Sequence, residues 1–257
     1  MKVHPTAVIS AHAQLDPDVE IGPYCVIGEE VSIGKGTIIG SHAVIEGPTS
    51  IGEQNTIFPF VCIGTPPQDV GYKDEDTSIR IGNGNIIREY VNINRATTKQ
   101  DGITIVGNNN YIMAYSHVAH DCVLGDGIIM ANVATLGGHT IIGDHANLGG
   151  IVATHQFVRI GAYAFIGGKS AVSQDVPPFV LAVGDRAKPY GINQKGLKRF
   201  GFSREVIDGL KKAYRIIWRE TRQLNEGISR VRKEIPLFPE LEMFLEFIMD
   251  SKRGVIR

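Results

Sequence analysis

The sequence predicts a mainly β fold, in which a parallel β-helix of hexapeptide repeats is followed by a small C-terminal α-helical domain. An aliphatic residue recurs every six positions, glycine often follows it directly, and a small or β-branched residue often stands four positions after it. The composition agrees, because 30 glycines and an aromatic content of 7% suggest many tight turns around a thin core.

The repeat runs from residue 3 to residue 63, returns over 81–93, and runs again over 106–172 after one slip. A period of six fits neither an α-helix nor a simple strand, but it fits a chain that makes a short strand, turns a corner and repeats. Three hexads would close one triangular coil, with the aliphatic side chains inside. Hexapeptide proteins of this kind wind left-handed, although the period alone does not determine the hand.

The end of the repeat sets the expected domain boundary. Residues 1–190 are expected to form the hexapeptide-repeat β-helix, and residues 191–257 the α-helical domain. Two polar, glycine-bearing segments, near 65–80 and 96–105, leave the pattern and are expected to be loops. Loops on a rigid scaffold often carry binding residues.

The C-terminal domain shows helix signals. Ser203 predicts an N-cap, and Pro239 predicts the start of the last helix. The apolar residues that follow helical spacing after Ser203 are Val206, Leu210, Ala213 and Ile217.

Composition excludes several classes of function. The net charge of -1 shows no bias toward nucleic acid or membrane surfaces. No apolar run approaches the roughly 20 residues that a transmembrane helix needs, and the N-terminus lacks a hydrophobic signal core. Cys25, Cys62 and Cys122 are odd in number and far apart, which predicts a reduced, cytoplasmic protein. Cys25 and Cys122 fall on the small inward position and are interpreted as packing thiols.

The coil period places several histidines together. Positions three hexads apart should lie one above another, so His120 is expected below Gly138, and Gly138 below Gln156. At Thr154 the aliphatic rule fails, and a broken local rule often marks a functional or strained site. The histidines that collect on this edge are His117, His120, His139 and His155.

Three chemistries fit such a cluster. Metal binding needs imidazoles that converge on one point. General-base catalysis needs an imidazole with an orienting acid, and His120 followed by Asp121 fits this best. Nucleophilic catalysis lacks a serine or cysteine beside a base, because Cys122 is expected to point inward.

The motifs HVAHDC, LGGH, THQF, QDVPP and GLKRFGF, in this order over essentially the whole chain, resemble those of the UDP-N-acetylglucosamine acyltransferase family. The resemblance implies an enzyme that begins lipid A assembly by moving a 3-hydroxyacyl chain from acyl carrier protein to the 3-position of a UDP-sugar. It also implies a homotrimer with sites between subunits, without a metal or a bound organic cofactor.

The resemblance implies a role for each matching residue. His120 corresponds to the general base, Asp121 to the residue that orients it, and the N–H of Gly138 to the oxyanion donor. Gly168 corresponds to the position that limits acyl length. The positions that correspond to substrate-binding residues are Gln68, Asp69, His117, His139, His155, Gln156, Asn193 and Arg199.

This sequence departs from the family pattern at several of these sites. Gly71 replaces a lysine of the first loop, with Lys73 two residues further on, and Asn94 replaces a histidine. Lys195 and Phe200 stand where an acid and a second arginine are usual. Some family members accept the 3-amino analogue of the sugar, so the acceptor atom, oxygen or nitrogen, stays open.

Three other functions compete with this interpretation. A later-acting UDP-sugar N-acyltransferase usually carries an extra N-terminal domain, whereas the hexads here begin at residue 3. A zinc carbonic anhydrase on the same helix uses two histidines five residues apart, and no two histidines here have that spacing. A non-catalytic scaffold would not explain the histidine cluster and the polar loops.

Overall fold

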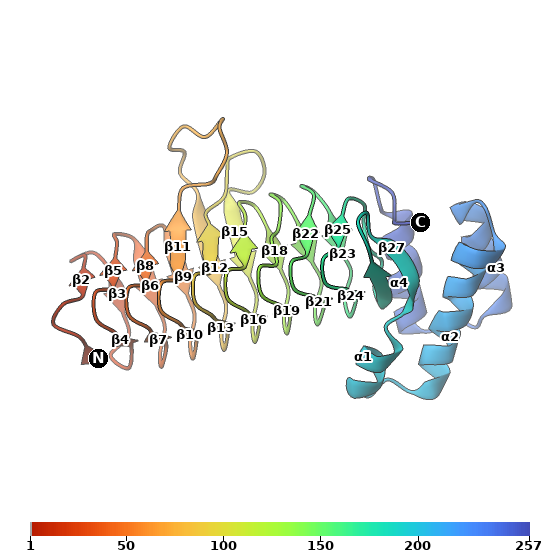
Figure 1. Cartoon of the computed structure of the whole chain (residues 1–257), viewed down its shortest axis with the longest axis horizontal. Helices are drawn as coiled ribbons and strands as arrows, with labels where there is room; N and C mark the ends of the chain where they lie inside the picture. Colours follow the sequence, from red (N-terminus) through yellow and green to blue (C-terminus); the bar gives the residue numbers. More distant parts are fainter. Residues whose placement is uncertain (1) are drawn as a thin grey trace.

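The computed structural model describes residues 2–257 and shows a long prism that ends in a group of helices (Figure 1). The prism is a left-handed parallel β-helix, as predicted. Short strands form its three faces, and most strands pair in parallel with the strand one coil above. On the second face single bridges through Thr135 connect β17 to β22, and the last strand, β27, pairs antiparallel with β26. The faces are called first, second and third here, in the order in which the chain enters them.

The first face holds β1 (Lys2–Val3), β4 (Glu20–Ile21), β7 (Ile38–Ile39), β10 (Thr56–Ile57), β13 (Ile86–Ile87), β16 (Tyr111–Ile112), β19 (Ile129–Met130), β21 (Asn147–Leu148), β24 (Phe165–Ile166), β26 (Val180–Val183) and β27 (Lys188–Ile192). The second face holds β2 (Val8–Ile9), β5 (Val26–Ile27), β8 (Val44–Ile45), β11 (Cys62–Thr65), β14 (Asn92–Asn94), β17 (His117–Val118), β22 (Ala153–Thr154) and β25 (Ala171–Val172). The third face holds β3 (Gln14–Leu15), β6 (Val31–Ile33), β9 (Thr49–Ile51), β12 (Ser78–Ile81), β15 (Ile103–Val106), β18 (Val123–Leu124), β20 (Ile141–Ile142) and β23 (Arg159–Ile160).

The hexad pattern explains the core. In regular coils the paired residues are three hexads apart, as for Val26 and Val44. The aliphatic residues of the repeat are buried from Ile21 onward, because each one points into the prism. Cys25 and Cys122 are fully buried at the small inward position, which confirms their interpretation as packing thiols.

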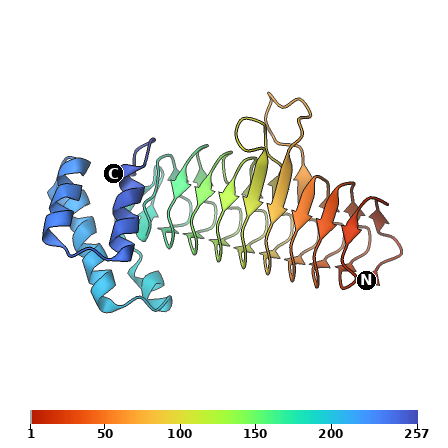
Figure 2. The same ribbon diagram turned by 180° about the vertical axis from the view of Figure 1, so that it is seen from behind.

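The edge between the second and third faces, named the site edge, carries both irregular segments. The chain leaves β11 and returns in β12 after residues 66–77, and it leaves β14 and returns in β15 after residues 95–102. Both loops project from the same side of the prism in either view (Figures 1 and 2). They leave from adjacent coils of the site edge.

The helices follow the last strands of the prism. The expected domain boundary between residues 190 and 191 falls inside β27, and the helical segments are α1 (Gln194–Arg199), α2 (Arg204–Arg215), the π-helical turn η1 (Ile216–Glu220), α3 (Leu224–Glu234) and α4 (Pro239–Met249). Ser203 caps α2 as predicted, since its side chain accepts a hydrogen bond from the Val206 N–H. None of the helices within residues 2–257 is long and apolar enough to cross a membrane.

Candidate active site

His120 and Asp121 form the corner of the site edge between β17 and β18. Asp121 has a left-handed backbone with φ 60°, and His139 has φ 61° one coil above. The His139 N–H donates to the His120 carbonyl over 3.0 Å, and the Phe157 N–H donates to the Gly138 carbonyl over 2.9 Å. The predicted stacking of successive coils at this edge is therefore confirmed.

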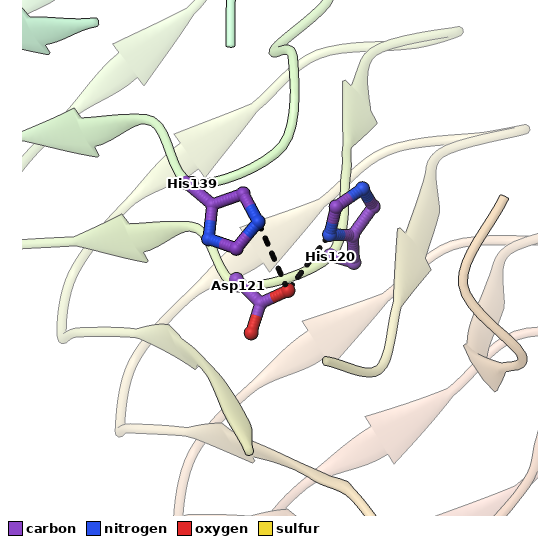
Figure 3. Close-up of side chains that lie close together, drawn as sticks. All are labelled: His120, Asp121 and His139. Carbon is purple, nitrogen blue, oxygen red and sulfur yellow. Dashed lines mark hydrogen bonds and ion pairs between the residues drawn. The ribbon is translucent and has the colours of Figure 1, made fainter. Parts of the chain in front are cut away.

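One carboxylate oxygen, Oδ2 of Asp121, is the centre of the cluster (Figure 3). Nδ1 of His120 lies 2.7 Å from it, and Nε2 of His139 lies 3.6 Å from it. Thr97, from the second loop, donates to the same oxygen through its backbone N–H at 3.0 Å and its hydroxyl at 2.8 Å. The second loop thus holds the carboxylate in place.

These contacts decide which nitrogen of His120 carries a hydrogen. Burial alone raises the pKa of Asp121, but the hydrogen bonds from His120 and Thr97 outweigh it, so the pKa lies below its ordinary value. A charged carboxylate only accepts hydrogen bonds, so Nδ1 of His120 must donate. Nε2 then keeps its lone pair, as a general base requires.

The edge of the His120 ring formed by Cε1 and Nε2 faces Gly138. A Cβ at position 138 would lie only 2.6 Å from Nε2, so any side chain there would collide with the ring. The Gly138 N–H donates no hydrogen bond within residues 2–257. It is therefore free to donate to an oxygen that develops charge beside His120.

Thr154, where the aliphatic rule fails, supports the turn that carries Gly138. Its hydroxyl oxygen accepts from the Gly137 N–H at 3.0 Å and lies 3.0 Å from the Thr140 hydroxyl. The threonine is buried, so its hydroxyl needs these partners. The broken repeat thus contributes to the site through the Gly137 backbone.

His139 is buried beneath the second loop. Its Nδ1 lies 2.6 Å from Oε1 of Gln100, and its ring stacks on Phe157 with centroids 4.3 Å apart. Burial is the main cause that lowers the pKa of His139. The imidazole is therefore neutral at neutral pH.

His117 lies on β17, just before the corner. Its Nδ1 is 2.9 Å from Oδ1 of Asn92, one coil below. Burial lowers its pKa first, and the charge of His120 lowers it further. Three of the four predicted histidines, His117, His120 and His139, thus come together in one chain.

The first loop approaches the cluster through Asp69. Lys99 of the second loop forms an ion pair with Oδ2 of Asp69, and the Gly71 N–H donates to Oδ1 at 2.7 Å. Gln68 is exposed. The Lys73 ammonium forms no ion pair within the described part of the chain, residues 2–257.

Asn94 fixes the base of the first loop. It is 2% exposed, and its amide nitrogen donates to the Thr65 hydroxyl and to the Pro66 carbonyl, both at 2.9 Å. In this chain the asparagine therefore holds the first loop at its base through these hydrogen bonds.

His155 and Gln156 lie directly above Gly137 and Gly138, as the coil period predicted, with exposed side chains. Other predicted residues lie at different edges of the prism. Asn193 caps α1 and donates to the Tyr163 carbonyl, so α1 with Arg199 packs at a different edge, between the third and first faces. Gly168 lies at the remaining edge, between β24 and β25.

The cluster also has the composition of a metal site. Ligand atoms of His120, Asp121 and His139 all lie within 4.8 Å of one another. Oδ2 of Asp121, however, accepts the hydrogen bonds of Thr97 and His120. This arrangement matches an oriented base.

Sequence reasoning missed Thr97, Lys99 and Gln100. All three lie within residues 95–102, where the hexad repeat is interrupted and therefore cannot predict where a side chain lies. The only available signal was the polar character of the loop beside the histidine-bearing coils.

The chain is similar to known acyltransferases over its full length. A profile described as UDP N-acetylglucosamine O-acyltransferase, domain 2, matches residues 175–256, and the bacterial transferase hexapeptide profile matches 12–47 and 103–138. The acyl-[acyl-carrier-protein]–UDP-N-acetylglucosamine O-acyltransferase of Thermodesulfovibrio yellowstonii is 57% identical, over 100% of this chain and 99% of the relative. The enzyme of the same name from Syntrophobacter fumaroxidans is 53% identical, over 100% of both. The crystal structure of a UDP-N-acetylglucosamine acyltransferase from Bacteroides fragilis aligns with a TM-score of 0.97, at 42% identity and over 99% of each chain.

Proposed function

Because the chain belongs to the acyl-[acyl-carrier-protein]–UDP-N-acetylglucosamine O-acyltransferase family, we propose that His120 is the general base of that transfer. The enzyme is an acyltransferase that uses acyl-[acyl-carrier-protein] as donor and UDP-N-acetylglucosamine as acceptor, the first step of lipid A biosynthesis. The observation that carries the proposal is the 2.7 Å contact between His120 and the Thr97-bound carboxylate of Asp121.

The proposed reaction uses the groups at this corner in turn. Nε2 of His120 takes the proton from the 3-hydroxyl of the sugar as its oxygen attacks the thioester carbonyl of a 3-hydroxyacyl chain. The N–H of Gly138 donates to the oxygen of the tetrahedral intermediate, a contact worth roughly 3 kcal/mol in such sites. As the C–S bond breaks, His120 returns the proton to the leaving sulfur. Asp121 orients the ring and stabilises its charged form throughout.

We infer that the working enzyme is a homotrimer. Asn193 and Arg199, which correspond to nucleotide-binding positions, lie at a different edge of the prism from His120 in one chain. A second copy packed beside the first would bring them to the site edge, and symmetric association would repeat this around a closed ring. Light scattering should therefore report three times the chain mass of 28.0 kDa.

The acyl chain is proposed to lie along the second face. A groove of about 740 Å³ occupies the upper part of this face, with Ala153, His155 and Ala171 in its lining. Gly168 borders the same face at its other edge and leaves room for a longer chain.

No metal and no bound organic cofactor enter this proposal, because the oriented histidine supplies the base. The three free cysteines, two of them buried, support a cytoplasmic location.

Mass spectrometry of the products tests the proposed function. Purified enzyme is given UDP-N-acetylglucosamine or its 3-amino analogue, with acyl carrier proteins that bear chains of several lengths. Transfer to either sugar supports the proposal and identifies the acceptor atom. In the same assay, Gly168→Met should shorten the preferred chain, since each methylene buried is worth about 0.8 kcal/mol. Absence of transfer to both sugars, with every donor, would overturn the proposed function.

A further inference from the structure

The two loops of the site edge meet through one ion pair. Lys99 of the second loop contacts Oδ2 of Asp69 in the first loop, while Oδ1 of Asp69 accepts from the Gly71 N–H at 2.7 Å. The Asp69 side chain is 14% exposed and the Lys99 side chain is 58% exposed. Asp69 is therefore held from both sides, whereas the ammonium keeps N–H donors that face solvent.

The space beside Gly71 is the space that the Lys99 ammonium reaches. A Cβ at position 71 would lie 3.9 Å from Nζ of Lys99 and 3.2 Å from Oδ1 of Asp69. A side chain at 71 would thus enter the region that Lys99 occupies from the opposite loop. Glycine at 71 and lysine at 99 are complementary in this structure.

Lys99 is also fixed relative to the catalytic groups. Its neighbour Thr97 donates twice to Asp121, and its neighbour Gln100 lies 2.6 Å from Nδ1 of His139. Burial lowers the pKa of His139 most, and the positive charge of Lys99 contributes in the same direction, as expected of a cation near the cluster. The bonds of Thr97 and Gln100 therefore hold the backbone of Lys99 beside the cluster, and the ion pair with Asp69 holds its ammonium.

We propose that Lys99 is a binding cation of the acceptor site, which contacts the UDP-sugar from the second loop beside Gly71. This rests on the proposed function, and it assigns to Lys99 the charge that position 71 lacks. Lys73 does not fit this role, because its ammonium makes no contact with Asp69 and only its backbone N–H is bonded, to Glu75. An ammonium at this place is compatible with a neutral 3-hydroxyl group on the sugar and opposes a protonated 3-amino group.

The test combines removal of the cation with its return from the other loop. Lys99→Ala should raise both the Kd for UDP-N-acetylglucosamine, measured by calorimetry, and its KM by about tenfold or more, since a charge-assisted hydrogen bond is lost. The kcat at saturating sugar should stay within a few-fold of wild type. Lys73→Ala, the matched control, should bind the sugar as wild type does.

The double variant Lys99→Ala, Gly71→Lys should recover most of the lost affinity, because a lysine at 71 starts 3.9 Å from the vacated position. A merely structural role of Lys99 predicts no such rescue. Unchanged Kd and KM in Lys99→Ala, or a fall in kcat alone, would overturn the assignment. Calorimetry measures binding without turnover. If the wild-type protein bound the sugar but transferred no acyl chain, the proposed reaction would be wrong. The comparison of Kd between wild type and Lys99→Ala would still test the role of Lys99.

Discussion

Two edges of the prism share the same left-handed corner conformation but carry different kinds of side chain. On the edge between the first and second faces, named the aromatic edge, the left-handed corner residues form a stack whose ring centroids are 4.8–5.0 Å apart: Tyr24, His42, Phe60, Tyr90 and Tyr115. On the site edge the corresponding corner residues are Asp121, His139 and Phe157, with φ of 60°, 61° and 64°.

The two edges differ in how far a loop buries their corner residues. Tyr115 is 59% exposed, while Asp121, in the same coil, is 5% exposed. The difference arises because residues 95–102 fold over the site edge and bond to Asp121 and His139. One coil higher the cover ends, and Phe157 is exposed again. A corner of this fold becomes a site when a loop buries it and supplies donors.

The largest expected effect comes from comparing the removal of one histidine from each edge. His120→Ala should reduce kcat about 10²–10⁴-fold, because a positioned general base is lost. His42→Ala, which removes a histidine from the aromatic edge, should leave kcat near wild type. Steady-state rates with saturating sugar and donor measure both. A His120→Ala enzyme with more than about a tenth of wild-type kcat would show that the base lies elsewhere.

The loop contact should matter next. Thr97→Val removes the hydroxyl donor to Asp121 but keeps the backbone N–H, so kcat should fall by about tenfold, the cost of one hydrogen bond to a charged group. Thr98→Val is the matched control, since Thr98 is the adjacent, exposed threonine. If both variants reduced kcat equally, the loop would act through its general stability and not through the carboxylate.

Buried histidines should make the site edge sensitive to acid. The pKa values of His117 and His139 are lowered by burial, so as pH falls below roughly 6.5 the unfolded chain takes up protons before the folded one. The free energy of unfolding should therefore fall from pH 7 to pH 5. Thermal unfolding across this range should show a smaller decline in His139→Gln than in wild type. An equal decline in both proteins would contradict the assignment.

The smallest effect should come from the aromatic edge. Tyr90→Ala removes stacking on Phe60 and Tyr115, each pair being worth about 1 kcal/mol. The protein should unfold at a slightly lower temperature, with kcat unchanged. A loss of activity larger than the loss of folded protein would mean that this edge also contributes to catalysis.

The hexad period was sufficient to predict the coil and the stacking within it. Each side chain on a coil has a position fixed by counting, so His120 below Gly138, the inward Cys122 and the irregular Thr154 could all be placed. The period could not predict contacts made by residues 66–77 and 95–102. A loop interior has no periodic position, and Thr97 reaches Asp121 across 24 residues of chain.

The sequence by itself determined the β-helix, its helical end and the edge that carries His120 and Asp121, because local hydrophobic spacing fixes which side chains point inward. Only the tertiary structure decided that Thr97 fixes the carboxylate, that Gln100 covers His139 and that Lys99, not Lys73, stands beside Gly71. These contacts depend on how two loops from adjacent coils pack on one edge, and such packing is set by their joint burial and hydrogen bonding.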